Sequence, residues 1–486
     1  MVAFILPANS ATGGYEISNS LRLNDNDTAY LNRTRSSQSN TTGTFSVWTK
    51  MGNVNVDNVL FGGATDVNNR SYIYFSDPDG FVGIFSRTSG SADIAYNSNA
   101  KFRDPSAWYH VVVAIDTTQG TAGNRFKMYI NGTQFTDWGT ATAPSQNASL
   151  PILNQAAQTV GGGFGSSSIS SMAEGYMADA YYIDGIAKAP TDFGETNDNG
   201  VWVPKKYDGS FGTNGFKLEF QQTGTGTASA STIGADTSGN DNHLTSNNLA
   251  ALDVTVDTPT NNFATLNPLI NSNGTYTLSE GNTKFVADGS NGWNTTIATM
   301  GFSKGKWYWE QKFTQITSGA SFAGLVKDDV NHADDDVSGQ DDSEGVLYYA
   351  NAGNYMFGAS GTYVSGGASF GDSFDDGDII SVAADLDNNK MYFAKNGTYQ
   401  GSGNPSTGSN GLPISEGAQG LVAGSFSFVF PYAGAYYAND GCEWNFGNPP
   451  FSISSSNADA NGYGNFEYAV PSGYYSLCTK NLAEYG

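Results

Sequence analysis

Cysteine, histidine and basic residues are all scarce in this sequence. Cys442 and Cys478 are the only cysteines among 486 residues, too few for a disulfide framework, so we expect two free, buried thiols. His110, His243 and His332 show none of the paired spacings of a zinc site. The chain has 22 basic and 46 acidic residues, which gives a net charge of -24. Such a chain repels phosphate backbones, and we expect no nucleic-acid partner.

Long apolar runs are also missing. No stretch approaches the roughly 18 apolar residues of a membrane-spanning helix. The apolar start, residues 1–7, is too short for a signal peptide and lacks a basic leader. We therefore expect no membrane insertion. The protein either stays inside the cell or leaves it without a signal, as a virion protein does on lysis.

Glycine and aromatic residues are abundant. The chain holds 60 Gly, 27 Tyr and 29 Phe, and long amphipathic helical patterns are absent, which favours short β-strands and turns. The clearest pattern runs from Gly377 to Gly397. It predicts a strand with one buried face, a tight turn at 387–389 and a second strand that ends at Asn396-Gly397, a pair typical of type I′ hairpins. The buried face of the first strand would carry Ile380, Val382, Ala384 and Leu386.

Three motifs in the second half resemble those of SPRY domains, which are β-sandwich recognition modules. They are "GKWYWEQKF" at 305–313, "GDIISVAADLDNNKMYFAKNG" at 377–397 and "NFGNPPF" at 445–451. The resemblance implies a SPRY-like sandwich over residues 277–452. It also implies binding through loops at one end, with the loop from 328 to 349 as the candidate surface.

The first half resembles the laminin-G-like, concanavalin A-like lectin/glucanase jelly roll. The resemblance rests on "FSVWTK" at 45–50, "WYHVVVAID" at 108–116, "FKMYINGT" at 126–133 and "MADAYYIDG" at 177–185. The fold class is therefore expected to be all-β, with two β-sandwich domains. The expected organisation is a jelly roll at 1–205, an ordered connector at 206–276, the SPRY-like sandwich at 277–452 and a C-terminal tail at 453–486.

The candidate binding residues lie in and after an acidic loop of the SPRY-like half. Several carboxylates close together could hold calcium, although the loop lacks the EF-hand pattern and also fits a solvated run of charge. Aromatic rings that follow the loop could stack on sugars, or could simply be sandwich core. The candidates are Asp334, Asp335, Asp336, Asp341, Asp342, Tyr348, Tyr349, Tyr355 and Tyr363.

We do not expect an enzyme. Retaining glycosidases need two carboxylates about 5 Å apart, and the Glu-x-Asp-x-x-Glu run of glucanases in this superfamily is absent. Glu174 and Asp179 come nearest, on opposite faces of a strand. Glu310 has no acidic partner at alternate spacing. His110 lies within a predicted core strand, where a histidine with satisfied hydrogen bonds is expected.

Four further stretches together resemble virion-associated proteins of marine bacteriophages. They are "ILPANSATGGYEISNSLRLND" at 5–25, "DTSGNDNHL" at 236–244, "TPTNNFATLNP" at 258–268 and "PSGYYSLCTKNL" at 471–482. The resemblance implies a virion structural or adsorption protein, such as a fibre, spike or capsid-displayed decoration. It would contact other virion proteins and bind a host-surface glycan or protein.

Weak modules of this kind gain strength by multivalency, so we expect a homo-oligomer, with a trimer favoured. No cofactor is expected, apart from the calcium considered above. Two alternatives remain open. One is a depolymerase acting on host polysaccharide, and the other is a purely structural protein that stabilises the capsid or tail.

Overall fold

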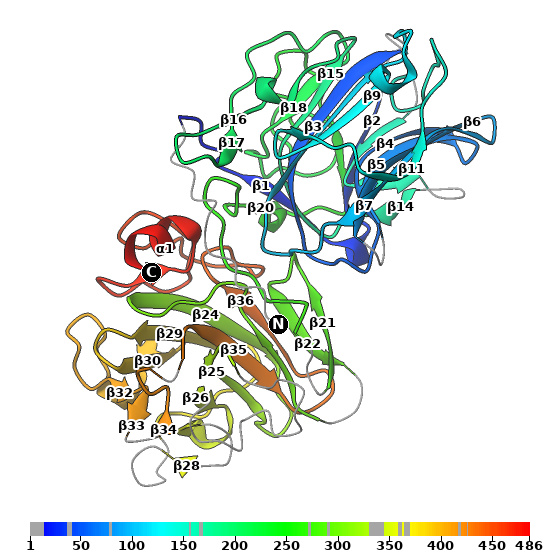
Figure 1. The fold of residues 1–486 in the computed structure, drawn as a ribbon. Coiled ribbons are helices and arrows are strands. Elements are labelled where there is room, and N and C mark those ends of the chain that lie inside the picture. Colours follow the sequence, from blue (N-terminus) through cyan, green and yellow to red (C-terminus); the bar gives the residue numbers. More distant parts are fainter. Residues whose placement is uncertain are drawn as a thin grey trace. The chain divides into compact units, whose positions relative to one another are not determined.

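A computed structural model describes residues 14–35, 41–76, 80–154, 157–164, 169–270, 274–288, 292–329, 345–357, 362–363, 370–416, 419–424 and 426–486. These residues form two compact units, one within 14–261 and the other within Asn262–Gly486 (Figure 1). Both units consist of antiparallel sheets packed face to face, which confirms the expected all-β class.

One sheet of the first unit, sheet A, has the strand order β10-β9-β8-β3-β15-β1-β20, with β18 also paired to β15. Its strands are β1 (Ser20–Leu23), β3 (Thr42–Met51), β8 (Tyr109–Asp116), β9 (Phe126–Ile130), β10 (Thr133–Gln134), β15 (Gly175–Asp184), β18 (Phe216–Leu218) and β20 (Val254–Thr255).

The opposing sheet, sheet B, has the order β11-β7-β6-β5-β4-β12-β2-β19. Its strands are β2 (Tyr30–Thr34), β4 (Asn58–Asp66), β5 (Asn69–Phe75), β6 (Phe81–Thr88), β7 (Ser91–Lys101), β11 (Trp138–Thr142), β12 (Ala157–Val160) and β19 (Thr245–Asn247). Two short hairpins and four 3₁₀ turns complete the unit: β13 (Gly162–Phe164) with β14 (Ile169–Met172), β16 (Gly194–Thr196) with β17 (Trp202–Pro204), η1 (Asp25–Asp27), η2 (Ala122–Asn124), η3 (Pro190–Asp192) and η4 (Ala251–Asp253).

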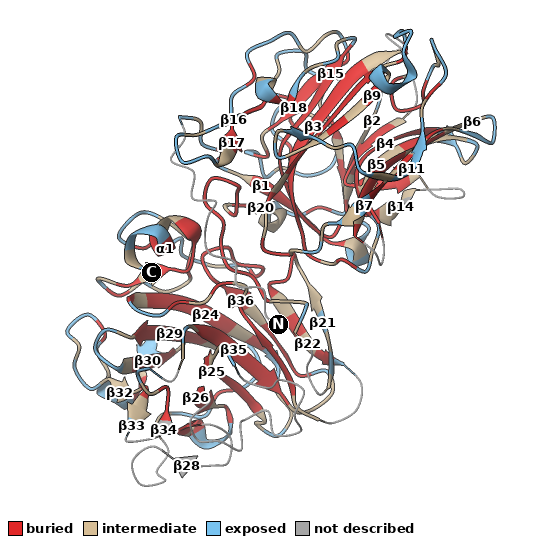
Figure 2. Cartoon of the chain, in the orientation of Figure 1, coloured by how far each residue is buried: buried red, intermediate tan, exposed pale blue. Residues whose placement is uncertain are grey.

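Alternation along the strands sends apolar side chains between sheets A and B. On β8, Val111, Val113 and Ile115 belong to this core, as period-two alternation requires. The opposite face of sheet A is also covered. Tyr181 of β15 packs there in a cluster with Phe193, which comes from the segment that follows β15. Figure 2 shows the resulting burial of the central strands.

The larger sheet of the second unit, sheet C, has the order β21-β22-β36-β24-β29-β30-β31, with β32 beside β30 and β37 parallel to β24. Its strands are β21 (Thr275–Ser279), β22 (Lys284–Asp288), β24 (Lys306–Gln315), β29 (Ile379–Asp385), β30 (Lys390–Lys395), β31 (Thr398–Tyr399), β32 (Leu412–Pro413), β36 (Gly441–Asn445) and β37 (Tyr475–Ser476).

The smaller sheet, sheet D, has the order β23-β35-β25-β26-β27-β28. Its strands are β23 (Asn294–Ile297), β25 (Ser321–Lys327), β26 (Gly345–Tyr349), β27 (Tyr355–Phe357), β28 (Thr362–Tyr363) and β35 (Val429–Ala435). The remaining elements are a small hairpin, two 3₁₀ turns and one helix: β33 (Ser415–Glu416) with β34 (Gln419–Gly420), η5 (Asn351–Gly353), η6 (Gln400–Ser402) and α1 (Thr479–Tyr485).

Strand β29 differs from the sequence prediction in one respect. Val382 and Ala384 point into the core between sheets C and D, as expected. Ala383, on the other face, is also fully buried, in a cluster with Phe466 and Tyr474 of the C-terminal segment. The strand is therefore buried on both faces rather than on one, because the chain's own C-terminal residues cover sheet C.

Two hairpin turns have the type I′ conformation, the predicted one at Asn396-Gly397 and another at Asn131-Gly132. Asn131 and Gly132 have φ of 48° and 78°, and Asn396 and Gly397 have φ of 49° and 80°. Positive φ at both central residues defines this turn. Both pairs connect adjacent antiparallel strands, β9 with β10 and β30 with β31.

The domain boundaries predicted at 205, 276 and 452 stay predictions. The structure places residues 206–261 within the first unit and 453–486 within the second. Cys442 and Cys478 are both free and buried, as expected, and burial raises the pKa of Cys442 to about 12. Among the described residues, no helix is long and apolar enough to cross a bilayer.

Candidate functional site

The outer face of sheet B, which points away from the core, carries a set of aromatic side chains. Alternation along β5 directs Ile73 into the core and Tyr72 and Tyr74 to the outer face. On β6 the same alternation directs Ile84 inward and Phe85 outward. Because a strand presents every second residue on one face, the β5–β6 hairpin forms an aromatic surface.

The strand register brings these rings together. Tyr72 lies directly opposite Phe85, with ring centroids 5.4 Å apart and an interplanar angle of 34°. Tyr74 makes edge contacts with Tyr72 at 5.1 Å and with Phe81 at 5.9 Å. All four rings are half-buried. The result is a continuous aromatic surface across two neighbouring strands, which we call the aromatic face.

A glycine and an asparagine shape one end of this face. Tyr74 lies opposite Gly83, and its hydroxyl donates a hydrogen bond to Asn97 Oδ1 on β7 at 3.1 Å. A Cβ at Gly83 would lie 2.5 Å from the Tyr96 carbonyl oxygen and 2.7 Å from Asn97 Oδ1. Glycine therefore keeps the space that lets the tyrosine reach across β6. Burial raises the pKa of both Tyr72 and Tyr74 above the usual tyrosine range.

Basic side chains border the aromatic rings. Arg70 lies opposite Arg87 on the neighbouring strand. The Arg70 Cζ is 5.9 Å from the Tyr72 ring centre, and the Arg87 Cζ is 5.7 Å from that of Phe85. Each guanidinium thus lies against the ring two positions away on its own strand, a favourable cation–π arrangement.

The β13–β14 hairpin borders the aromatic face beyond β5. Strand β13 packs next to β4 and β5. The Phe164 carbonyl oxygen accepts a hydrogen bond from Arg70 Nη1 at 2.8 Å. Val59 of β4 pairs with Tyr74, and Gly163 lies close enough that an added Cβ would be 3.0 Å from a Val59 methyl group. The aromatic face is therefore bounded on one side by a short hairpin.

A separate groove of about 420 Å³ opens at one edge of sheet A. Its polar lining includes Lys127, which is half-buried, and Lys188, which pairs with Asp192 at 3.4 Å. The Asp116 carboxylate is already held by hydrogen bonds from Thr118 and Gln119, which lower its pKa. The groove offers Tyr129 as its single aromatic ring. Its polar groups are therefore partly engaged within the protein.

The predicted binding residues have varied positions. Asp334, Asp335, Asp336, Asp341 and Asp342 lie outside the described residues. Tyr363 belongs to β28, and its side chain is not among the described ones. The other three predicted residues are Tyr348, Tyr349 and Tyr355.

Two of these tyrosines belong to the core. Tyr348 and Tyr355 are 0% and 2% exposed, and their hydroxyls donate to the carbonyl oxygens of Asp372 and Pro413. They expose no ring that a sugar could stack on, because both rings pack in the core on the inward face of sheet D. Tyr349 is half-buried on the opposite face of the same sheet, against Phe322 at 5.4 Å.

His110 is the satisfied core histidine that the sequence predicts. It is 1% exposed, and its Nδ1 accepts a hydrogen bond from Trp202 Nε1 at 3.0 Å. Its Nε2 therefore carries the proton and donates to Ser46 Oγ at 2.9 Å. Burial lowers the pKa of His110 to about 3. The imidazole is neutral and fully engaged, which leaves it no catalytic role.

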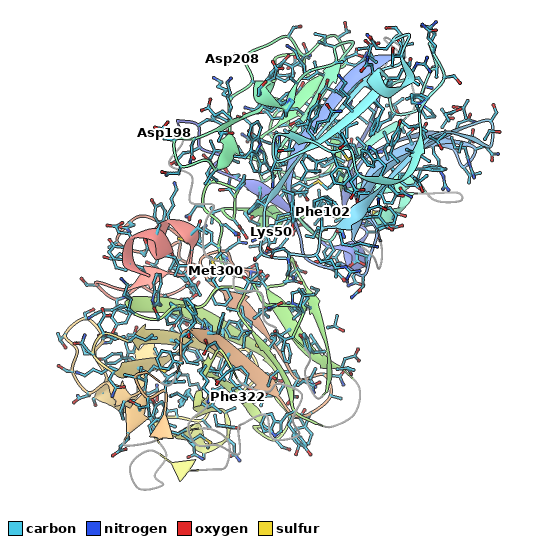
Figure 3. All side chains as sticks on the ribbon, viewed as in Figure 1. Lys50, Phe102, Asp198, Asp208, Met300 and Phe322 are labelled. Atoms are coloured by element: carbon cyan, nitrogen blue, oxygen red, sulfur yellow. The ribbon has the colours of Figure 1, made fainter. Side chains whose placement is uncertain are left out.

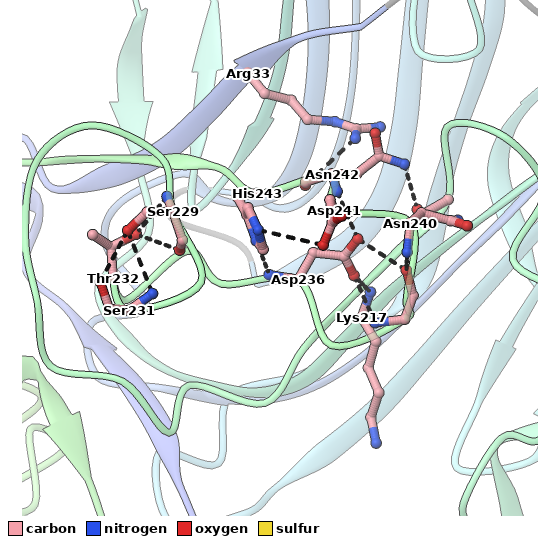
Figure 4. Close-up of polar contacts among 12 residues, drawn as sticks. Arg33, Lys217, Ser229, Ser231, Thr232, Asp236, Asn240, Asp241, Asn242 and His243 are labelled. Carbon is pink, nitrogen blue, oxygen red and sulfur yellow. Dashed lines mark hydrogen bonds and ion pairs between the residues drawn. The ribbon is translucent and has the colours of Figure 1, made fainter.

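His243 belongs to a polar turn that Asp236 organises (Figure 4). The Asp236 carboxylate accepts hydrogen bonds from the backbone amides of Lys217, Ser238 and Asn242 at 2.8–2.9 Å. The His243 Nδ1 accepts from the Asp236 amide at 2.9 Å. Asn240 and Asn242 donate further hydrogen bonds to carbonyl oxygens of residues 212–215. The turn therefore holds together the stretch around β18, within the predicted connector.

The buried carboxylate of Glu310 has a structural environment. It accepts four hydrogen bonds, from the Tyr308 hydroxyl at 3.0 Å, Asn445 Nδ2 at 3.0 Å and the amides of Glu467 at 3.0 Å and Tyr468 at 2.9 Å. Burial raises its pKa, while these donors oppose the shift. With every lone pair engaged, Glu310 anchors the C-terminal segment on sheet C.

Glu174 and Asp179 also serve the fold. Glu174 Oε2 accepts from the Asp25 amide at 3.0 Å. Asp179 Oδ2 accepts from the hydroxyls of Tyr15 at 2.8 Å and Tyr181 at 2.9 Å. Their hydrogen bonds go to different parts of the unit, so they do not form the shared pair that retaining hydrolysis needs. Among the described residues, no group of three or more His, Cys, Asp or Glu is arranged to hold a metal ion.

The sequence reasoning missed the aromatic face. The outward rings of these two strands are not among the predicted binding residues. The available signal was Tyr-x-Tyr on one strand and Phe-x-x-x-Phe on the next, at 72–74 and 81–85. An outer sheet face normally alternates to polar residues, so outward aromatic residues on both arms of one hairpin indicate a binding surface.

Two family models match separate parts of the chain. Residues 24–180 match Laminin_G_3, described as the concanavalin A-like lectin/glucanases superfamily, and residues 306–449 match the SPRY domain. No curated protein matches the chain.

Several solved structures are similar to parts of the chain. The SPRY domain of human HERC1 is 19% identical, covers 33% of this chain and 87% of its own, and has a TM-score of 0.23. A heptameric SAP-like pentraxin from Limulus polyphemus is 15% identical, with coverages of 36% and 80% and a TM-score of 0.26. A putative carbohydrate binding protein from Bacteroides ovatus is 14% identical, with coverages of 48% and 59% and a TM-score of 0.30. The family matches thus place a laminin-G-like, concanavalin A-like segment ahead of a SPRY-like one, and the structure forms β-sheets in both.

Proposed function

We propose that this protein binds glycans without cleaving them, and that the aromatic face of the first unit is the binding surface. The observation that carries the proposal is the outward pair of Tyr72 and Phe85, directly opposite each other on adjacent strands. Pyranose rings present flat faces of C–H groups that pack on aromatic rings. An extended, half-exposed row of rings suits a chain of sugars better than a single small molecule.

Polar groups at the edges of the rings would orient the sugar. Asn97 already accepts from Tyr74, and its amide can bond to a sugar hydroxyl at the same time. Each such hydrogen bond adds only about 1 kcal/mol after water is displaced. One face would therefore bind weakly, and several copies joined in one assembly would bind far more tightly. This is why we propose a homo-oligomer, with a trimer favoured.

We further propose that the protein is part of a bacteriophage virion, as a fibre, spike or capsid-displayed decoration. In this role it would contact other virion proteins and attach to a glycan of the host surface. The support is the resemblance of four separated stretches, at 5–25, 236–244, 258–268 and 471–482, to virion-associated proteins of marine bacteriophages. Electron microscopy of purified phage particles with an antibody against this chain tests the location. Labelling of infected-cell debris but not of particles would contradict it.

Glycan binding can be tested with an array of bacterial surface polysaccharides. We expect the wild-type protein to bind a subset of them. Replacing Tyr72→Thr and Phe85→Thr should weaken binding at least about tenfold, because threonine keeps the strand propensity but removes the stacking surface. Tyr129→Thr, in the groove of sheet A, is the matched control and should bind normally.

Several outcomes would overturn this assignment. Unchanged binding by the double variant, together with lost binding by Tyr129→Thr, would move the site to the groove. No binding to any glycan would favour the purely structural role. Release of new reducing ends from a bound polysaccharide would identify a depolymerase instead.

A further inference from the structure

We infer that the aromatic face selects anionic glycans, whose carboxylate or sulfate groups are bound between Arg70 and Arg87. This inference rests on the proposed function, because it names the class of glycan for the same surface. Its basis is the placement of two arginines side by side at one end of the aromatic rows.

The strand register sets the two arginines directly opposite each other. Arg70 of β5 pairs with Arg87 of β6, one row beyond the pair of Tyr72 and Phe85. Like charges at directly opposed positions of a sheet are unfavourable. An anion between the two guanidinium groups would turn this repulsion into two charge-assisted interactions.

Both guanidinium groups are oriented by the aromatic rings. The Arg70 Cζ lies over the Tyr72 ring, 5.9 Å from its centre, and the Arg87 Cζ lies over the Phe85 ring, 5.7 Å from its centre. A sugar would therefore stack beside the guanidinium groups, on the part of the aromatic face that they leave uncovered. Arginine presents a planar set of donors that matches a carboxylate or sulfate. Because stacking restricts both side chains before binding, less conformational entropy is lost when the anion arrives.

The local charges favour one orientation of the ligand. Asp57 raises the pKa of Tyr72 and of Tyr74, so its negative charge lies near the tyrosine rings. Asp93 lies on the outer face of β7, the strand beside β6. Among the described residues, the Arg87 Nε and the Asp93 Oδ2 are both buried and neither has a hydrogen-bond partner. An anionic substituent should therefore lie over the arginine pair, while Lys101, whose Nζ is 5.9 Å from the Phe81 ring centre, adds a further cation at the opposite end.

The arginine pair belongs to a chain that is strongly acidic as a whole. With 22 basic against 46 acidic residues and a net charge of -24, the protein repels dense polyanions at long range. This repulsion is screened beyond about 8 Å at physiological ionic strength, whereas direct contacts persist. The surface thus fits a sugar polymer with separated charges, and double-stranded DNA, with one charge per roughly 1.7 Å, would be repelled.

The test compares polymers that share a backbone and differ in charge. Binding of dextran and carboxymethyl dextran, and of polygalacturonate and its full methyl ester, is measured by biolayer interferometry on the intact protein. We expect each charged polymer to bind at least about tenfold more tightly than its neutral counterpart. Arg87→Gln should reduce that ratio to near one, and Arg87→Lys should restore part of it. Lys127→Gln, with the same change in net charge, should leave the ratio unchanged.

The outcomes separate the two proposals. If charged and neutral polymers bind wild-type protein equally, and Tyr72→Thr weakens both, glycan binding stands and the anionic selection is wrong. If Lys127→Gln removes the preference as strongly as Arg87→Gln does, the arginine pair is not the site. If no polymer binds, both proposals fall. Binding of duplex DNA with similar affinity would show charge attraction without sugar recognition, and would also overturn the inference.

Discussion

At the scale of single residues, His110 shows how burial changes the chemistry of a reactive side chain. Trp48 stacks on one side of its ring at 4.6 Å, and Trp202 and Ser46 hold its two nitrogens. A proton added at Nδ1 would face the Trp202 N–H and lose that bond. Burial keeps the imidazole neutral. The three contacts join β3, β8 and β17, so the residue acts as a packing element.

We predict that His110 does not titrate in the folded protein above about pH 4. Its pKa falls from 6.5 to about 3 on folding, so between these values the unfolded chain binds a proton that the folded chain does not. The resulting contribution of His110 to the free energy of unfolding is fully present above pH 6.5. It is lost as the pH falls, by up to about 1.4 kcal/mol per pH unit. NMR spectra of the His110 imidazole nitrogens, recorded as a function of pH, check it. A His110 titration near pH 6.5 would contradict the prediction.

A buried ion pair ties the segment before residue 261 to sheet A. Lys50, labelled in Figure 3, bonds to Asp257, and the two side chains are 1% and 0% exposed. The Lys50 Nζ also lies 4.8 Å from the centre of the Tyr176 ring. Burial lowers the pKa of Lys50, although Asp257 opposes the shift. Each charge needs the other as its counter-charge, because neither group is exposed to water.

Removing one partner of this pair should be strongly destabilising. We predict that Asp257→Asn lowers the free energy of unfolding by about 3–5 kcal/mol, because it leaves a buried ammonium without its counter-charge. Asp192→Asn is the matched control, since it removes a half-exposed partner of Lys188 and should cost no more than about 1 kcal/mol. Urea unfolding followed by tryptophan fluorescence measures both. Equal stability of the two variants would contradict the prediction.

At the scale of elements, the C-terminal segment holds sheet C through two carboxylates. Glu310 on β24 accepts from two amides of the segment. Asp459 in turn accepts from the Ser476 amide at 2.9 Å and from Asn481 Nδ2 at 2.7 Å. Phe466 packs against Tyr308 beneath these bonds. The segment is thus a structural cover of this face of the sheet.

We predict that Glu310→Gln loosens this cover. The glutamine NH₂ would face an N–H or O–H donor at a position where the carboxylate oxygen now accepts a hydrogen bond. Each buried donor left unpaired in this way costs about 1–3 kcal/mol. Hydrogen exchange should therefore increase at residues 459–476 while β25 and β35 stay protected. Glu467→Gln, at an exposed carboxylate that accepts from Ser454, should leave the exchange pattern unchanged. Faster exchange throughout the second unit would indicate general unfolding and contradict a local role.

At the scale of the whole molecule, the chain consists of two separately folded units. Each unit has its own core between two sheets, and each needs residues beyond its family-matched segment to cover an outer sheet face. In the first unit these are residues after β15, and in the second they are residues after β36. The units therefore extend past the regions matched by the family models, for a physical reason: an uncovered sheet face would expose apolar side chains.

We predict that a fragment of residues 262–486 folds alone and that one of residues 262–452 does not. The shorter fragment lacks two donors to Glu310 and exposes Tyr308 and Ala383, which are 0% exposed in the intact unit. Circular dichroism and size-exclusion chromatography distinguish a cooperative monomer from an aggregate. A stable, soluble 262–452 fragment would show that the C-terminal segment contributes little.

Much of the fold could be predicted from local patterns. Alternation at Ile380–Ala384, the Asn-Gly pair at 396, and the apolar run around His110 each predicted a strand, a turn or a core position that the structure confirms. These signals depend on neighbours along one strand, where period-two alternation and positive φ act directly on the residues concerned. The same reasoning could not separate stacking tyrosines from core tyrosines, so Tyr348 and Tyr355 were predicted as binding residues and lie in the core.

The aromatic face arises from contacts that no single stretch encodes. Tyr72 meets Phe85, and Arg70 meets Arg87, only because β5 and β6 pair in one register, and a shift of one residue would turn both rows into the core. Likewise, Ala383 is buried by residues about 80 positions later in the chain. Local alternation thus decides which side chains leave a strand on the same face. Strand pairing and the covering segments decide which of those faces remain open to a ligand.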